Sequence, residues 1–281
     1  MLMYAKDVRD GELPINKIVC GDCIEVMRKF PPNSIDLIIA DPPYNVNLVD
    51  TRADWDKQPV NWDEVFREFR FILKPNGYVF IFGMLSSLSW VVTTAVKYGF
   101  RVWFDFVWVK EQSKNFTMAK KKPMNQHEII VCLISKEFKS SEATYNYKEI
   151  GNKGKPYRVR WQGYSSYRDI IMKEKASNGF RYPTTVLKFD SANAAFGKKK
   201  ETKHPTEKPL DLIMYLVRGF SKPNDVILDP FLGSGTTAVA CKILGRKFIG
   251  IEIDEKWCKV ATERLKKKAT LTNYVGLSRY A

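Results

Sequence analysis

The chain has 281 residues, a length that one α/β domain with insertions can fill. Hydrophobic residues make up 44% of it and charged residues 27%, which excludes a mainly disordered protein, and the net charge of +15 favours an acidic partner. No apolar run approaches the roughly 18 residues that a membrane span needs, and the first residues are too charged for a signal peptide. We therefore expect a cytoplasmic protein without membrane contact.

The first third of the chain alternates between strand and helix patterns. Short β-branched runs at residues 18–20 and 35–40 are typical of buried parallel strands, and residues 23–30 between them predict a short helix. Residues 61–73 repeat apolar positions at helical spacing and stop at KPNG, a turn signal, before the strand-like residues 78–82. This rhythm predicts βα units.

The rest of the chain keeps this rhythm at both ends and loses it in the middle. A helix ending near Gly99 and a strand at residues 101–110 are followed by a polar, turn-rich segment, residues 135–203, which we expect to be an insertion. A helix within residues 204–220 and two strands flanking the loop FLGSGTT then restore the alternation. The pattern predicts an α/β fold with a doubly wound, mostly parallel sheet, whose ligands bind at the carboxyl ends of its strands.

The middle of the chain concentrates the positive charge. Between Lys110 and Lys208 there are 22 Lys and Arg against 10 Asp and Glu, so 22 − 10 = +12 of the excess falls there. Residues 155–169, KPYRVRWQGYSSYRD, interleave aromatic rings with these cations. Rings can stack on bases while cations meet phosphates, although a solvated surface explains charge alone equally well. The candidate nucleic-acid contacts in this stretch are Lys155, Arg158, Arg160, Trp161 and Arg168.

A glycine-rich loop follows the predicted strand that ends at Asp229. Gly233, Gly235 and Ala238 fit the spacing G-x-G-x-x-A, and Glu252 ends the next strand, where a carboxylate commonly binds a ribose. Glycines let the backbone approach a ligand, and a helix N-terminus favours negative charge. The pattern favours a nucleoside-containing cofactor but does not separate a dinucleotide from another adenosine cofactor, and such a turn can be purely structural. The phosphate-loop pattern of nucleotide triphosphatases is absent.

The stretch DPPY follows the strand at residues 35–40. Pro42 and Pro43 fix the backbone and remove two donors, so their carbonyls and the Asp41 carboxylate form a stiff row of acceptors beside Tyr44. Such a corner suits a planar group with an exocyclic amine, which the acceptors would bind while the ring stacks on the tyrosine. Hydrogen bonds of this kind would make the amine lone pair available for attack on an electrophile. The alternative is an ordinary strand-terminating turn.

Three motifs together resemble those of DNA amino-methyltransferases of the adenine-N6 type: ADPPYN, DPFLGSGTT, and HPTEKP at residues 204–209. The catalytic motif precedes the cofactor motif, which is the order of the group called β. The resemblance covers the chain apart from about residues 135–200. It implies the fold of S-adenosylmethionine-dependent methyltransferases in one domain, 1–281, with a catalytic half at 1–134, an inserted target-recognition region at 135–203, and a cofactor-binding half at 204–281.

The resemblance also implies the cofactor S-adenosyl-L-methionine and its binding residues. Asp22 would face the cofactor adenine, Glu252 would take the ribose hydroxyls, and Asp229 would lie near the amino group. Thr206 and Lys208 would hold the carboxylate end. The implied set is Asp22, Cys23, Asp41, Thr206, Lys208, Asp229, Phe231, Gly233, Ser234, Gly235, Thr236, Thr237 and Glu252.

The resemblance implies direct methyl transfer without a metal or a covalent enzyme intermediate, carried by Asp41, Pro42, Pro43 and Tyr44. Asp41 and the Pro42 carbonyl would accept from the target amine, and Tyr44 would stack on the base. The amine is paired inside a duplex, so the base of double-stranded DNA must be flipped out.

Several segments carry weaker signals. Lys110 and Asn115 are expected near the DNA, and Glu128 in NQHEII is expected to have a structural or DNA-facing role rather than to bind a metal. The pair of cysteines in CGDC is expected to be free, since a zinc site needs about four ligands. The terminal stretch RLKKK reads as a helix end.

Alternative functions remain open at this point. A cytosine-N4 enzyme would use the same chemistry, although the resemblance associates that specificity with a serine in place of Asp41. RNA as substrate, a nicotinamide-dependent oxidoreductase using the same glycine loop, and a DNA-binding protein without catalysis are the others. The resemblance allows a homodimer, and no partner restriction endonuclease is visible in this chain.

Overall fold

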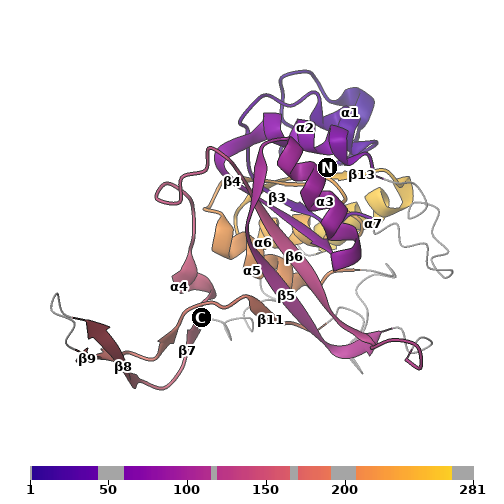
Figure 1. Cartoon of the computed structure of the whole chain (residues 1–281). Helices are drawn as coiled ribbons and strands as arrows, with labels where there is room; N and C mark the ends of the chain where they lie inside the picture. Colours follow the sequence, from indigo (N-terminus) through magenta and orange to yellow (C-terminus); the bar gives the residue numbers. More distant parts are fainter. Residues whose placement is uncertain (1, 44–59, 115–118, 165–169, 191–206, 268–281) are drawn as a thin grey trace.

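The computed structural model describes residues 2–43, 60–114, 119–164, 170–190 and 207–267 (Figure 1). Within these ranges, no helix is both long enough and apolar enough to cross a membrane.

The described residues form one large mixed sheet in the order β1-β2-β13-β12-β3-β4-β6-β5-β11. All neighbours pair in parallel except β6, which runs antiparallel to β4 and to β5. The predicted doubly wound, mostly parallel sheet is therefore confirmed. The strands are β1 (Leu2–Tyr4), β2 (Lys17–Cys20), β3 (Ile35–Ala40), β4 (Leu73–Gly83), β5 (Phe100–Lys114), β6 (Asn125–Ser135), β11 (Val186–Lys188), β12 (Val226–Asp229) and β13 (Lys247–Glu252).

Helices cover both faces of this sheet (Figure 1). Successive side chains of a strand point to opposite faces, so Leu37 and Ile39 of β3 join one buried cluster while Ile38 and Ala40 join the other. The first cluster lies under α5 (Leu210–Phe220), α6 (Thr236–Ile243) and α7 (Glu255–Lys267), and the second under α1 (Cys23–Met27), α2 (Trp62–Ile72) and α3 (Leu85–Lys97). A 3-10 turn, η1 (Ala5–Asp7), follows β1.

The KPNG stretch was expected to be a turn before a strand, and the structure corrects this expectation. All four residues lie inside β4, because Leu73 already pairs with Ile35 and the next pair is Tyr78 with Leu37. The extra residues form an irregularity in the strand. A Cβ on Gly77 would lie 2.9 Å from the Asp36 carbonyl oxygen, so glycine permits this close approach.

The inserted segment combines a peripheral arm with pieces of the main core. A hairpin of β8 (Tyr157–Tyr164) and β9 (Ile170–Ser177) projects away from the main sheet (Figure 1). The short pair β7 (Asn152–Lys153) and β10 (Phe180–Arg181) lies at its base. The segment returns to the core through α4 (Tyr147–Ile150), whose Ile150 is buried there, and through β11, which pairs with β5.

Candidate active site

A cavity of about 530 Å³ opens at the carboxyl ends of four adjacent parallel strands. Each strand contributes one acid to its wall: Asp22 follows β2, Glu252 ends β13, Asp229 ends β12 and Asp41 follows β3. Parallel strands deliver their carboxyl ends to the same edge of a sheet, which is why residues from distant motifs meet here. The lining includes Asp22, Cys23, Asp41, Pro42, Pro43, Lys208, Asp229, Phe231, Gly233, Ser234, Thr236, Thr237 and Glu252.

The glycine loop between β12 and α6 takes a backbone path that other residues rarely adopt. Gly233 has φ 54° and Gly235 has φ 87°, both in the left-handed region. A Cβ on Gly235 would also lie 2.8 Å from the Ala261 Cβ on α7. The Gly233 amide donates a hydrogen bond of 2.8 Å to Glu252 Oε2, which ties the loop to the end of β13.

The acids at the ends of β12 and β13 lie in a setting that disfavours their charge. Burial raises the pKa of Asp229 to about 7, although hydrogen bonds from the Thr237 hydroxyl (2.6 Å) and the Phe231 amide (3.0 Å) act in the opposite direction. Burial also raises the pKa of Glu252. A positively charged ligand group in this cavity would favour both ionised carboxylates, so the wall suits a cation.

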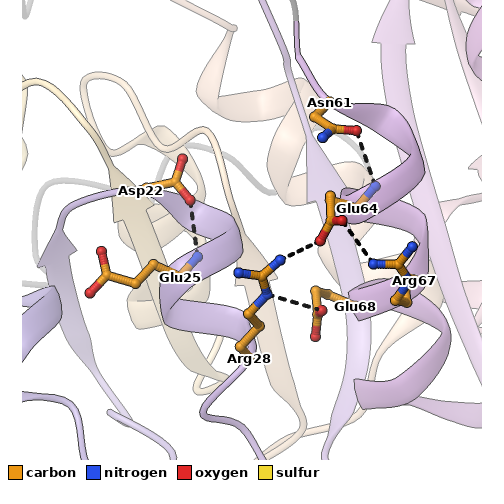
Figure 2. Close-up of polar contacts among 7 residues, drawn as sticks. All are labelled: Asp22, Glu25, Arg28, Asn61, Glu64, Arg67 and Glu68. Carbon is orange, nitrogen blue, oxygen red and sulfur yellow. Dashed lines mark hydrogen bonds and ion pairs between the residues drawn. The ribbon is translucent and has the colours of Figure 1, made fainter.

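Two helix N-termini border the cavity, each capped by a side chain, and an ion pair joins the two helices (Figure 2). Asp22 caps α1 by accepting a 2.9 Å hydrogen bond from the Glu25 amide, and Asn61 caps α2 by accepting one of 3.3 Å from the Glu64 amide. Arg28 at the end of α1 donates to the Glu64 carboxylate on α2. Each cap satisfies the first turn of its own helix, and the Arg28–Glu64 pair links the two helices.

At the corner after β3, a lysine pairs with the predicted catalytic residue Asp41. Lys208 Nζ lies 2.6 Å from Asp41 Oδ2 and 3.6 Å from Glu128 Oε2. Burial alone would lower the pKa of Lys208, but Asp41 and Glu128 outweigh it and raise that pKa. Lys208 was expected to hold the carboxylate end of a cofactor, and here it pairs with side chains of the protein. Pro42 and Pro43 line the cavity beside it.

Lys110 and Glu128 lie inside the protein. Both side chains are buried, and Lys110 donates to the Glu128 carboxylate. Lys110 was expected to contact DNA, but it does not present its ammonium on the surface, because sheet packing between β5 and β6 encloses this ion pair. Glu128 was expected to have a structural or DNA-facing role, and its contacts are those of a buried partner for two lysines.

Arg264 is a residue of this site that the sequence analysis missed, because RLKKK was read as a helix end. Its guanidinium is buried, pairs with Glu207 at 2.6 Å, and donates to Thr236 Oγ1 at 2.9 Å and Ser234 Oγ at 3.2 Å. It therefore links α7 to the glycine loop and to the residue before Lys208. The apolar residues Trp257 and Ala261, seven and three positions before Arg264, were a signal in the sequence that it lies on the inner face of α7.

Apart from Lys110, the predicted DNA contacts lie on or next to the β8–β9 arm or outside the described residues. Arg158 and Arg160 on β8 and Lys155 before it are exposed. Alternation along β8 places both arginines on the face opposite Tyr157, over whose ring Arg181 packs at 3.9 Å. Trp161 belongs to β8 as well. The residues outside the described ranges are Tyr44, Asn115, Arg168 and Thr206.

The cysteines of CGDC, Cys20 and Cys23, are free and buried. Across the described part of the chain, no group of three His, Cys, Asp or Glu side chains is arranged to hold a metal ion.

Comparison with known proteins agrees with this geometry. The family model described as DNA methylase, N6_N4_Mtase, matches residues 35–263. The chain is 32% identical over 275 residues to the type II methyltransferase M.HinfI of Haemophilus influenzae, covering 90% of this chain and 69% of that protein. It is 31% identical over 276 residues to the type II methyltransferase M2.LlaDCHI of Lactococcus lactis subsp. cremoris, covering 90% of both.

Solved structures share the fold. The complex of M1.HpyAVI with SAM superposes with a TM-score of 0.57 at 23% identity, covering 94% of this chain and 100% of that chain. The cytosine-N4-specific PvuII DNA methyltransferase superposes with a TM-score of 0.61 at 16% identity, covering 92% and 91%. The family match spans more than half of the chain, and a strand-edge cavity joins its motifs. The chain therefore belongs to the N6/N4 DNA methylase family and is a DNA methyltransferase.

Proposed function

We propose that this enzyme transfers a methyl group from S-adenosyl-L-methionine to the N6 amine of adenine in DNA, as a site-specific methyltransferase of the β group. The observation that carries the proposal is one cavity that joins the Asp41-Pro42 corner to the glycine loop and Glu252. A cofactor site and an acceptor corner for an amine are thus adjacent, as direct transfer between two bound molecules requires.

The cavity fits the cofactor in size and in chemistry. Its volume of about 530 Å³ lies within the range of small-molecule sites, and Gly233, whose φ is positive, brings backbone without a side chain to its wall. Glu252 would bind the ribose hydroxyls, Asp22 the adenine, and Asp229 the ammonium group. The bound cofactor supplies an electrophilic methyl group on a sulfonium.

Asp41 would accept a hydrogen bond from the target amine, and the Pro42 carbonyl would accept a second. These two acceptors would direct the amine lone pair toward the methyl group, so that a nitrogen–carbon bond would form as the carbon–sulfur bond breaks with its electron pair left on sulfur. The nitrogen then carries a surplus proton, and the nearby Asp41 carboxylate is the acceptor through which it leaves to solvent. Pro42 and Pro43 keep this corner rigid because each fixes φ.

The base must leave the duplex to reach this corner, at a cost of about a few kcal/mol. Tyr44 would stack on the flipped base, and cations of the inserted region, such as Arg158 and Arg160, would bind phosphates. Similarity to M.HinfI and M2.LlaDCHI, both named type II methyltransferases, supports a role beside a restriction endonuclease encoded elsewhere.

Cytosine N4 is the alternative target. The fold is shared with a cytosine-N4-specific enzyme, and the same acceptors would bind either exocyclic amine. Asp41 in place of serine favours adenine.

Mass spectrometry of nucleosides from unmethylated DNA incubated with the enzyme and S-adenosylmethionine tests the proposal. N6-methyladenine is expected, and reactions without cofactor or with Asp41→Ala serve as controls. Detection of N4-methylcytosine would show that the target base is cytosine and not adenine. The absence of any methylated base would refute the activity on DNA.

A further inference from the structure

Four alternating charges form a chain that leads from the cavity into the sheet. In order they are Asp41, Lys208, Glu128 and Lys110. Asp41 Oδ2 lies 2.6 Å from Lys208 Nζ, which lies 3.6 Å from Glu128 Oε2, and Lys110 donates to the other oxygen of Glu128. Each inner member therefore has an opposite charge on both sides.

The side chain at the cavity end of this four-charge chain is more exposed than the other three. Asp41 is 23% exposed, whereas Lys208, Glu128 and Lys110 are 8%, 11% and 6% exposed. Water screens buried charges little, so a change of charge at one end is felt at the other. Asp41 is the most exposed of the four, and it lines the cavity.

The order of strands assembles the chain from distant parts of the sequence. β3, β4, β6 and β5 lie side by side, and Glu128 stands opposite Trp108 in the ladder between β6 and β5. Lys208 Nζ lies 5.3 Å from the centre of the Phe82 ring on β4, and Lys110 Nζ lies 4.9 Å from that of Trp108. These rings stabilise both ammonium groups without neutralising them.

We propose that Glu128 and Lys110 are positioning residues for methyl transfer, which set through Lys208 how strongly Asp41 accepts from the target amine. The proposal rests on the proposed function in taking Asp41 as that acceptor. Lys208 is paired with both Asp41 and Glu128, and the negative charge of Glu128 offsets part of the positive potential that Lys208 produces at Asp41. Lys110 is paired with Glu128 and offsets part of that negative charge in turn.

Other charged groups also face Asp41. Asp229 on the neighbouring strand is close enough that the charge of Asp41 contributes to raising its pKa. The cavity wall adds the acids Asp22, Glu207 and Glu252. The variants below leave all four acids in place, so any difference in the direction of their effects comes from Glu128 and Lys110.

Two isosteric substitutions should move the pH profile in opposite directions. Glu128→Gln removes a negative charge, which leaves Asp41 ionised to lower pH, so the acid-side fall of kcat should move down by about 0.5 to 1 pH unit. Lys110→Met removes a positive charge and should move the same limb up by about as much. The double variant should return close to the wild-type profile, since both charges are gone.

A merely structural role predicts a different result. Both variants would then lose activity or stability with an unchanged pH profile, or would shift it in one direction, and either result would overturn the proposal. Lys74→Met is the matched control, because it removes a 2.6 Å ion pair with Asp36 at the opposite end of β3. Its pH profile should equal that of the wild type, and Lys110→Arg should restore most of the wild-type profile.

A measurement without catalysis separates this inference from the proposed function. In a double-mutant cycle of thermal unfolding at pH 7, the Tm change of Asp41→Asn with Lys110→Met should differ from the sum of the single changes by at least about 2 °C. Additive changes would overturn the coupling even if the enzyme methylates adenine. Non-additive changes in an enzyme that methylates no base would support the charge chain while the proposed function fails.

Discussion

The cavity and the β8–β9 arm place their charges in opposite ways. Around the cavity, Asp229 and Arg264 are buried: Asp229 accepts two hydrogen bonds from the glycine loop and α6, and Arg264 donates to Ser234 and Thr236. On the arm, Arg158 and Arg160 are exposed on a two-stranded ribbon outside the main sheet. Chemistry needs fixed geometry, which strand ends supply, whereas attraction of a phosphate backbone needs only charge and reach. Substitutions in the two regions should therefore change different measured quantities.

Among substitutions in the two regions, Asp41→Ala should have the largest effect on activity. The acceptor of the target amine is lost while the glycine loop remains, so kcat should fall by about 10³-fold. Cofactor affinity, measured by calorimetry, should change by less than about threefold, and circular dichroism should be unchanged. Retained turnover would contradict the assignment of Asp41.

Arg264→Met tests whether buried charge around the cavity maintains the fold. It removes the 2.6 Å ion pair with the buried Glu207 carboxylate, so the free energy of unfolding should fall by about 3 kcal/mol. Urea denaturation measures this. The neighbouring Glu263→Gln is the control, because the pair of Glu263 with Lys266 is exposed, and this variant should leave the free energy of unfolding nearly unchanged. Equal losses in both variants would contradict the role of Arg264.

Gly235→Ala separates backbone strain from close packing. Positive φ alone should cost about 1 to 2 kcal/mol of unfolding free energy, and contact with Ala261 should add to this and weaken cofactor binding. Gly245→Ala is the matched control, since Gly245 has φ 67° but no atom within 4 Å of its Cβ position. The difference between the two variants measures the packing contribution, and no difference would exclude it.

Cofactor affinity should depend on pH through Asp229. Its pKa of about 7 lies above that of the unfolded chain, so the stability it contributes to the free protein is present at low pH and is lost as pH rises toward 7. A cationic ligand favours the ionised form, so the dissociation constant should fall about tenfold between pH 5.5 and 7.5 with proton release, and then level off. Calorimetry in buffers of different ionisation enthalpy measures this, and Asp229→Asn should remove the dependence.

The arm should give the smallest effect and a different kind of effect. Replacing Arg158 and Arg160 together with alanine should weaken DNA binding by about three- to tenfold and lower the salt slope by about 2. Cofactor binding should not change. The matched control replaces the exposed Lys121 and Lys122, with no expected change in slope. An unchanged slope in the arginine variant would show that these side chains do not meet phosphates.

Local patterns predicted the parts of the molecule that are themselves local. Apolar runs predicted β2 and β3, helical spacing predicted α2 within one residue at each end, and the glycine loop lies between β12 and α6 as expected. The irregularity at residues 74–77 was missed because the KPNG pattern indicates a turn locally, whereas pairing with β3 keeps these residues within β4. The sequence did not predict that part of the inserted region joins the main sheet, because β11 is a short strand that forms by pairing with β5.

Contacts between distant segments could not be predicted in the same way. Lys208 and Asp41 are 167 residues apart in sequence, and their pairing depends on the order of strands. Arg264 and Ser234 meet only because α7 packs closely against the glycine loop. Residue types indicated the chemistry of this site, but which side chains form ion pairs and hydrogen bonds with one another could be determined only from the fold.

The antiparallel pairing of β6 with β5 determines how the Lys110–Glu128 ion pair is held in place. Lys110 on β5 donates to Glu128 on the neighbouring antiparallel strand β6, although 17 residues lie between them in sequence. The pair lies near the end of the ladder that begins at Phe100 and Ser135, where the register shifts after Val109. The register of the two strands therefore sets the distance between these charges, so a one-residue slip would separate them and uncouple Asp41 from Lys110.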